Sequence, residues 1–193
     1  MSAPGIAIET KPLVPSGLLA VAIFVASEAI FFAALISAFV VLRAQALDWP
    51  PFDQPRLPVL VTGINTAILL LSGCTIHGAL RSVRASGARL TGWLAATAVL
   101  GALFLAIQGY EWVRLVGFGL TTSSSLYGAT FYALVGAHGV HVLAALVVVL
   151  VVAVRGYRGR YGAAEHTGVA MCHLYWLFVV AVWPVLYALV YLR

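Results

Sequence analysis

One acidic residue, Glu28, lies inside the first apolar stretch of the chain, twelve residues after Ser16. In a helix that rises about 1.5 Å per residue, its carboxyl is about 18 Å into the stretch, near the middle of a bilayer. A charge at that depth is costly, and no basic residue lies within one helical turn of Glu28. We therefore expect Glu28 to be neutral at pH 7. The residues leave two interpretations open: a carboxyl that exchanges protons, or a protonated carboxyl hydrogen-bonded to a neighbouring helix.

Four histidines also fall inside apolar stretches. His138 and His141 are three residues apart and share one helical face. His77 lies near the end of the second stretch and His173 within the fifth. Imidazoles on facing helices can hold a b-type haem, or they can form interhelical hydrogen bonds. Because His138 and His141 are one turn apart on one helix, they cannot both be axial ligands of one iron. No carboxylate stands at helical spacing beside them to complete a metal site, so we expect interhelical hydrogen bonds.

Gln108 and Glu111 form a further pair of polar residues, three positions apart at the end of the third stretch. Trp112 follows at once, as in the aromatic belt of a membrane interface. We therefore expect Glu111 to reach the headgroup region, and it can also pair with Arg114, three residues later.

The elements that position these residues follow from composition. Hydrophobic residues make up 63% of the 193 residues and charged residues 9%, and the mean hydropathy is +1.04. Soluble domains have about 45–50% apolar and about 25% charged residues, so a water-soluble globule, a disordered chain and a disulfide scaffold are excluded. Backbone groups inside lipid are satisfied only in helices or closed barrels, and these stretches are too long for barrel strands. We expect an all-α bundle of five transmembrane helices over residues 16–193, after an N-terminal tail of residues 1–15. The predicted spans are residues 16–42, 57–80, 90–110, 126–154 and 167–192.

Positive charges lie in the tails and connections and favour one orientation. Seven Lys and Arg residues fall on the side of the N-terminus and four on the other, and ten of these eleven are Arg. The positive-inside rule then predicts a cytoplasmic N-terminus and an outside C-terminus in the cell's inner (plasma) membrane. Nothing in this distribution indicates nucleic-acid binding. The seven are Lys11, Arg81, Arg84, Arg89, Arg155, Arg158 and Arg160, and the four are Arg43, Arg56, Arg114 and Arg193.

The remaining motifs indicate packing. Cys74 and Cys172 lie in apolar stretches without a CxxC motif, and we expect both to be buried free thiols. Residues 121–125 offer an N-cap to the fourth helix. The sequence has no P-loop, GxSxG or HExxH motif, so the chain is not expected to catalyse a reaction by itself.

The motifs of the five stretches, taken in order, resemble those of subunit III of the haem–copper oxidases, which include cytochrome c and quinol oxidases. The most specific are the Q-x-x-E-[YW] run at residues 108–112 and the YG…F…G-x-HG-x-HV run at residues 127–142. The SE-x-x-FF stretch around Glu28 is also similar. Further matches are Trp49-Pro50-Pro51 and, in the second stretch, Asn65-Thr66 with Ser72 and Thr75. The intramembrane polar residues expected to serve packing are Asn65, His77, Gln108, Glu111, His138, His141 and His173.

The resemblance implies the five-helix form of this subunit, which lacks the two N-terminal helices of seven-helix members. Such a subunit is not catalytic and binds no haem or copper, which are expected in partner subunits. It packs on the catalytic subunit I of a respiratory oxidase with further subunits, and a cleft between its helices holds structural phospholipid. It is expected to support proton uptake and sustained turnover during O₂ reduction. The family carboxyl that reacts with carbodiimide corresponds to Glu28.

The last stretch departs from the family pattern YWHF-x-D-x-VW, because Leu177 and Val180 stand where the family has His and Asp. Their face is apolar except for His173, so we expect any partner of His138 or His141 across this interface to be His173 or the backbone. Three alternatives stay open: a subunit-III-like accessory protein of nitric oxide reductase, a stand-alone membrane haem protein, and a small transporter or channel.

Overall fold

A computed structural model describes residues 15–52, 54–85 and 87–192 of the chain. It contains five helices long and apolar enough to cross a membrane, and no strand within these ranges, so the all-α prediction is confirmed. Residues 1–14 of the expected tail lie outside the described residues, as do Asp53, Ser86 and Arg193. The helices are α1 (Ser16–Gln45), α2 (Val59–Ala85), α3 (Leu90–Gly117), α4 (Leu126–Tyr157) and α5 (Thr167–Val190).

Several helices run beyond the predicted spans, since α3 continues to Gly117 rather than 110 and α2 to Ala85 rather than 80. Apolar stretches mark the thickness of the hydrocarbon, whereas helical hydrogen bonding continues through polar residues until the backbone must turn. Gly119 and Gly159 make such turns, with φ of 89° and 69°, each two residues after a helix ends. This left-handed conformation favours glycine.

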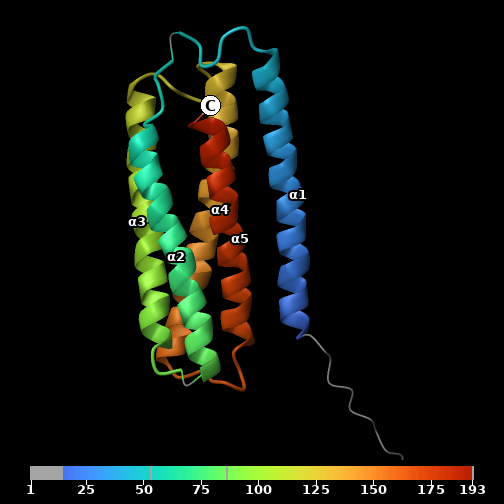
Figure 1. Ribbon diagram of the computed structural model, residues 1–193, viewed down its shortest axis with the longest axis vertical. Coiled ribbons are helices and arrows are strands. Elements are labelled where there is room, and N and C mark those ends of the chain that lie inside the picture. Colours follow the sequence, from blue (N-terminus) through green and yellow to red (C-terminus); the bar gives the residue numbers. More distant parts are fainter. Residues whose placement is uncertain (1–14, 53, 86, 193) are drawn as a thin grey trace, which may run out of the picture.

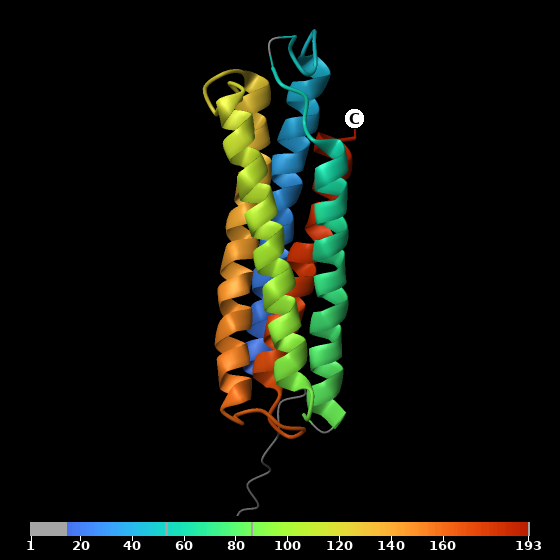
Figure 2. The same ribbon diagram turned by 90° about the vertical axis from the view of Figure 1, so that its left-hand side faces the viewer.

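Helices α2, α3, α4 and α5 form a closed ring, because α2 packs on α3, α3 on α4, α4 on α5 and α5 on α2. Helix α1 lies outside this ring against α4 and α5, and among the described residues it packs on no other helix. Figure 1 shows α1 beside the ring, and Figure 2 shows the same bundle turned by 90°. Of the side chains of α1, Phe32 and Phe39 alone are buried.

Two tryptophans of α5 fill the centre of the ring. Trp176 and Trp183 are 1% and 0% exposed. Trp176 Nε1 donates a hydrogen bond to Ser72 Oγ at 3.0 Å, and Trp183 Nε1 donates to Thr66 Oγ1 at 2.8 Å. Both acceptors belong to α2, so the two indoles join α5 to α2 while their buried donors are satisfied. Gly101 of α3 faces Trp176 so closely that a Cβ there would overlap the ring.

Arginines are distributed unevenly between the two ends of the bundle, as the sequence predicts. One end, drawn at the bottom of Figure 1, is where α2 and α4 finish and α3 and α5 begin. Which end faces the cytoplasm stays a prediction. The described residues at this end include Arg81, Arg84, Arg89, Arg155, Arg158, Arg160 and Glu165, and the opposite end has Arg43, Arg56 and Arg114.

Two smaller expectations had different outcomes. The N-cap of α4 is confirmed, because Ser125 Oγ accepts a hydrogen bond from the backbone N–H of Gly128 at 3.1 Å. The prediction of buried thiols holds for Cys172, which is 2% exposed, but it is wrong for Cys74, which is exposed. An apolar span gives the depth of a residue in the bilayer, but a weakly amphipathic helix does not show which face points outward.

The contact between Gly101 and Trp176 predicts that Gly101→Ala lowers the stability of the folded chain. Trp176 is fully enclosed and cannot move aside, and overpacking of this kind costs about 1–3 kcal/mol. The measurement is the thermal unfolding temperature of the full chain in mild detergent.

Gly109→Ala is the matched control, because it lies on the same helix and its Cβ would meet no atom within 4 Å. The control should be neutral or stabilising by up to about 1 kcal/mol, since alanine is the better helix former. Equal unfolding temperatures for the two variants would show that the ring tolerates a larger residue at position 101.

Candidate functional site

Glu28 of α1 and His141 of α4 meet between the two helices. Glu28 Oε2 lies 2.6 Å from His141 Nε2, although the residues are 113 positions apart in the chain. The two side chains are 19% and 17% exposed, so one edge of the pair is open at the surface of the bundle. Phe31 and Phe32 flank the imidazole, with ring centroids 6.0 Å and 5.0 Å from that of His141. A short hydrogen bond in apolar surroundings is strong.

The protons of this pair can be counted from its geometry. His141 Nδ1 lies 2.7 Å from the backbone oxygen of Ala137, and a carbonyl oxygen can only accept, so Nδ1 bears a hydrogen and donates it. The contact between Nε2 and Glu28 must then hold one further proton. Without it, a carboxylate oxygen and a nitrogen lone pair would face each other at 2.6 Å. The proton is either on the carboxyl, beside a neutral imidazole, or on the imidazole, beside a carboxylate.

Both arrangements give the pair a net charge of zero, which reduces the cost of burying it at membrane depth. The structure thus places Glu28 in a hydrogen bond with a neighbouring helix, which was one of the two interpretations. Exchange of this proton with the surroundings stays a prediction. No basic residue lies near Glu28 on its own helix, and His141 of α4 takes that place.

His138 has a different environment from His141, although the two share part of one helical face. His138 is 1% exposed and stacks on Trp183, with ring centroids 4.9 Å apart. Phe32 and Phe104 meet it edge-on. Neither ring nitrogen has a hydrogen-bond partner among the described residues, so the expected interhelical hydrogen bond is not seen for this residue. Its contacts are those of an aromatic core residue.

Gln108 belongs to a buried polar cluster between three elements. Asn65 Nδ2 of α2 donates to the backbone oxygen of Phe104 at 3.1 Å and lies 3.5 Å from Gln108 Oε1 of α3. Gln108 Nε2 donates to the hydroxyl of Tyr191, the residue after α5, at 3.1 Å. The cluster joins α2, α3 and the end of α5. The sequence alone did not single out Tyr191, whose position at the end of an apolar stretch gives no signal of this contact.

The carboxyl of Glu111 is buried within the bundle. It is 5% exposed and accepts a hydrogen bond from Arg114 Nη1 at 3.1 Å. The side chain of Arg114 is 48% exposed, so the ion pair has one buried and one exposed partner. Of the two interpretations of Glu111, the structure shows the pairing with Arg114.

His77 and His173 contact each other across the interface of α2 and α5. Their Nδ1 and Nε2 atoms are 3.2 Å apart. His173 is therefore engaged with α2 and makes no hydrogen bond to His138 or His141. Among the described residues no group of three or more His, Cys, Asp or Glu side chains could hold a metal ion.

Leu177 and Val180, which replace the family's His and Asp, face the same neighbouring helix. A Cβ on Gly73 of α2 would lie 3.3 Å from Val180 and 3.6 Å from Leu177. The apolar pair thus fills the close contact between α5 and α2. His141 finds its partners elsewhere, on Glu28 and on the backbone of its own helix.

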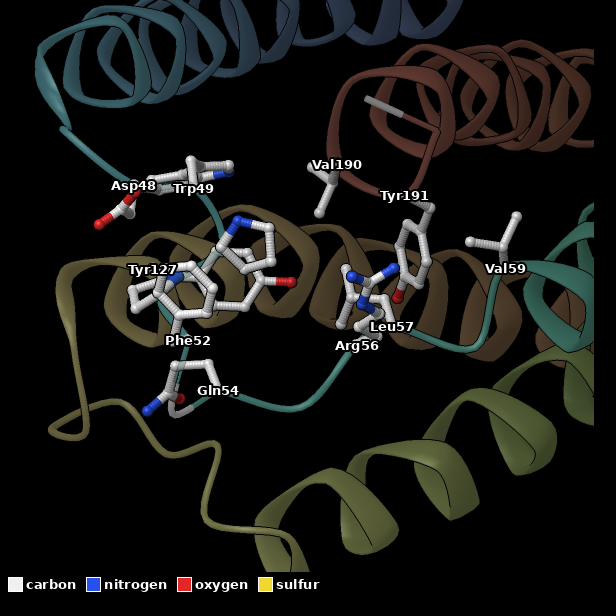
Figure 3. A pocket seen from close by; sticks show the side chains of 12 residues that line it. Asp48, Trp49, Phe52, Gln54, Arg56, Leu57, Val59, Tyr127, Val190 and Tyr191 are labelled. Atoms are coloured by element: carbon white, nitrogen blue, oxygen red, sulfur yellow. The ribbon is translucent and has the colours of Figure 1, made fainter.

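A pocket of about 570 Å³ lies at the opposite end of the bundle from the arginine-rich end. Figure 3 shows that the connection between α1 and α2 lines it together with residues of α4 and the end of α5. Trp49 packs edge-on against Tyr127 with ring centroids 5.1 Å apart, and against Phe39 at 5.7 Å. The sequence singled out Trp49-Pro50-Pro51 as a motif but did not predict a pocket. These contacts fix the connection that follows α1.

Comparisons with known proteins place these features in one family. The model of the family described as cytochrome c oxidase subunit III matches residues 7–193. A protein of Synechocystis sp. named cytochrome c oxidase subunit 3 is 39% identical over 89% of this chain and 73% of its own length. A protein of the same name from Thermostichus vulcanus is 37% identical over 88% of this chain and 84% of its own length. A probable cytochrome c oxidase subunit 3 of Nocardia farcinica is 36% identical over the same shares.

The proton count predicts that Glu28→Gln and Glu28→Leu differ in stability. The amide of glutamine can donate to Nε2 of a neutral His141, whereas leucine leaves Nε2 without a partner. Interhelical hydrogen bonds in membranes contribute about 0.6 kcal/mol on average and up to about 1.7 kcal/mol. We expect the thermal unfolding temperature of the full chain in detergent to stay near wild type for glutamine and to fall for leucine.

His141→Phe provides the reciprocal test. It should lower the unfolding temperature in the wild-type background and have a smaller effect in the Glu28→Leu background, because the hydrogen bond is already lost there. Additive effects of the two substitutions would contradict the pairing.

Proposed function

The chain belongs to the cytochrome c oxidase subunit III family, and from this premise we propose that it is a non-catalytic subunit of a respiratory haem–copper oxidase that packs on the catalytic subunit I. The observation that carries this proposal is the family match over residues 7–193, which includes all five helices. Haem and copper would be held by partner subunits. The role of this chain is to stabilise the complex and to support proton uptake and sustained turnover during O₂ reduction.

The pair of Glu28 and His141 supports the proton-related part of the proposal. It holds one proton that can reside on either residue, and its side chains are partly exposed at the surface of the bundle. Transfer of this proton between the two residues leaves the net charge of the pair at zero, so it brings no net charge to membrane depth. Glu28 is therefore the proton-related carboxyl in this proposal, and His141 its positioning partner.

Helix α1 supports the proposed contact with subunit I. Apart from Phe32 and Phe39, its apolar side chains are not enclosed by the chain itself. An outward face of this kind can be covered by lipid or by another membrane subunit. A second apolar pocket, of about 550 Å³ beside Ala22, Leu80 and Leu174, supports a structural phospholipid held between α1, α2 and α5.

The protein is a multi-pass membrane protein, since all five helices can span a bilayer. We place it in the inner (plasma) membrane with its N-terminus in the cytoplasm. The end of the bundle at which α1 begins has six arginines and one glutamate among the described residues. This excess of positive charge supports the orientation through the positive-inside rule.

Affinity purification of the tagged chain from its native membrane in mild detergent tests the assignment. We expect haem and copper to co-purify, with absorbance bands of an oxidase and O₂ consumption in the eluate. The chain expressed alone should show no Soret band. Isolation of the chain without partners would favour a transporter, and a Soret band from the chain alone would favour a haem protein. Co-purification of NO-reducing activity without O₂ reduction would favour an accessory protein of nitric oxide reductase.

Thiol labelling tests the orientation. Phe118 lies in the connection after α3 and is 64% exposed, and Arg158 lies in the exposed connection after α4 at the opposite end. In intact cells, a membrane-impermeant maleimide should label Phe118→Cys and not Arg158→Cys. Both should react after the membrane is opened. The reverse pattern in intact cells would invert the proposed topology.

A further inference from the structure

A pocket of about 1040 Å³ opens where the end of α2 meets the start of α3. Its lining includes neither Glu28 nor any residue of α1, although His77 lines both this pocket and the pocket beside Ala22. One part of its lining is polar and lies at the arginine-rich end of the bundle, and the other part is apolar and lies deeper along α2.

Two guanidinium groups stand at the polar part. Arg81 of α2 and Arg89, just before α3, both line the pocket and are exposed. Neither forms an ion pair with a carboxylate of the described residues. Ser82 Oγ accepts a hydrogen bond from the backbone N–H of Arg89 at 3.2 Å, which holds the start of α3 against the end of α2. The fold thus keeps both arginines on one pocket without an acidic partner among the residues that the structure describes.

The apolar part extends toward the middle of the bundle. Trp93 of α3 lies against α2 at Gly78, where a Cβ would be 2.8 Å from the indole ring. Cys74 and Gly73 continue the wall along α2, and Leu177 of α5 adds to it. Gly73 lies eight positions before Arg81, which corresponds to about 12 Å along the helix axis. The wall therefore runs along the direction in which an acyl chain enters the bilayer.

The arrangement fits one class of occupant. Arginine binds phosphate oxygens through charge-assisted hydrogen bonds, and two arginines at the membrane surface attract a negative phosphodiester. The end of the bundle that contains them has six arginines and one glutamate among the described residues. A soluble anion would leave the apolar wall uncovered, whereas a membrane lipid covers it with its acyl chain.

We propose that this pocket binds one anionic phospholipid, with its phosphodiester between Arg81 and Arg89 and an acyl chain along Gly78 and Cys74 toward Leu177. The site is independent of the proposed role in proton uptake, and its two arginines, Arg81 and Arg89, do not line the pocket beside Ala22. The bound lipid would complete the contact between α2 and α3 at the membrane surface.

Retained lipid can be measured directly on the full chain with whatever subunits accompany it. The protein is reconstituted in bilayers of phosphatidylcholine with a minor fraction of phosphatidylglycerol, extracted in mild detergent, and its bound lipids are counted by native mass spectrometry. We expect one tightly retained phosphatidylglycerol. The double variant Arg81→Gln/Arg89→Gln should weaken its retention about thirtyfold, because each arginine near a lipid surface contributes about fivefold. Arg158→Gln/Arg160→Gln is the matched control, since it removes two charges from the same end outside the pocket.

A second pair of variants tests the apolar wall without a change in charge. Cys74→Phe fills the wall and should lower retention of phosphatidylglycerol, whereas Leu71→Phe, on the outward face of the same helix and outside the pocket, should not. Equal losses of phosphatidylglycerol in the two arginine double variants would contradict the proposal, because the lipid would then be attracted to the whole end of the bundle and not to this pocket. Equal retention of phosphatidylcholine, or no retained lipid in the wild type because a partner protein covers the pocket, would also overturn the proposal. None of these results depends on the identity of the oxidase.

Discussion

A polar side chain inside a bilayer gains from a hydrogen-bond partner within the protein, because hydrocarbon offers none, and this constraint shapes how the helices of this chain meet. His138, which packs on aromatic rings instead, is an exception. The indoles of Trp176 and Trp183 are satisfied by hydroxyls of α2. Gln108 joins α3 to Tyr191 at the end of α5. Glu28 is satisfied by α4. Each contact removes a cost that the same residue would have on an isolated helix, so the bundle and its polar residues depend on each other.

The four helices of the ring and helix α1 differ in the contacts that hold them. The ring has several buried polar contacts and two enclosed tryptophans, so its four helices define one another's positions. Helix α1 is held by fewer contacts: Phe32 and Phe39, the pair with His141, and a hydrogen bond from Arg43 Nη1 to the backbone oxygen of Leu189 at 3.1 Å. A subunit built in this way has a rigid body and one helix whose outer face can adapt to a neighbour.

The sequence predicted the number and order of the helices well, because hydrophobic length is a local property. Partners were harder to predict. Glu28 lies 113 residues from His141, and no local pattern connects them. His138 and His141 share a spacing that suggested one role, yet their side chains diverge enough for one to stack on Trp183 and the other to meet α1. Cys74 points outward because α2 turns another face to the ring, and composition alone does not show which face that is. The family resemblance singled out Glu28 as the proton-related carboxyl, and the structure added His141 as its hydrogen-bond partner.

The distance in sequence between Glu28 and His141 also has a consequence for how the protein is made. At about 5–20 residues per second, a ribosome needs roughly 6–20 s to synthesise the segment between them. During this interval α1 has left the ribosome while α4 has not, so Glu28 is in the membrane or in the insertion machinery without its imidazole. Insertion of the first helix therefore precedes the hydrogen bond that Glu28 makes in the finished bundle, which forms only when the fourth helix arrives.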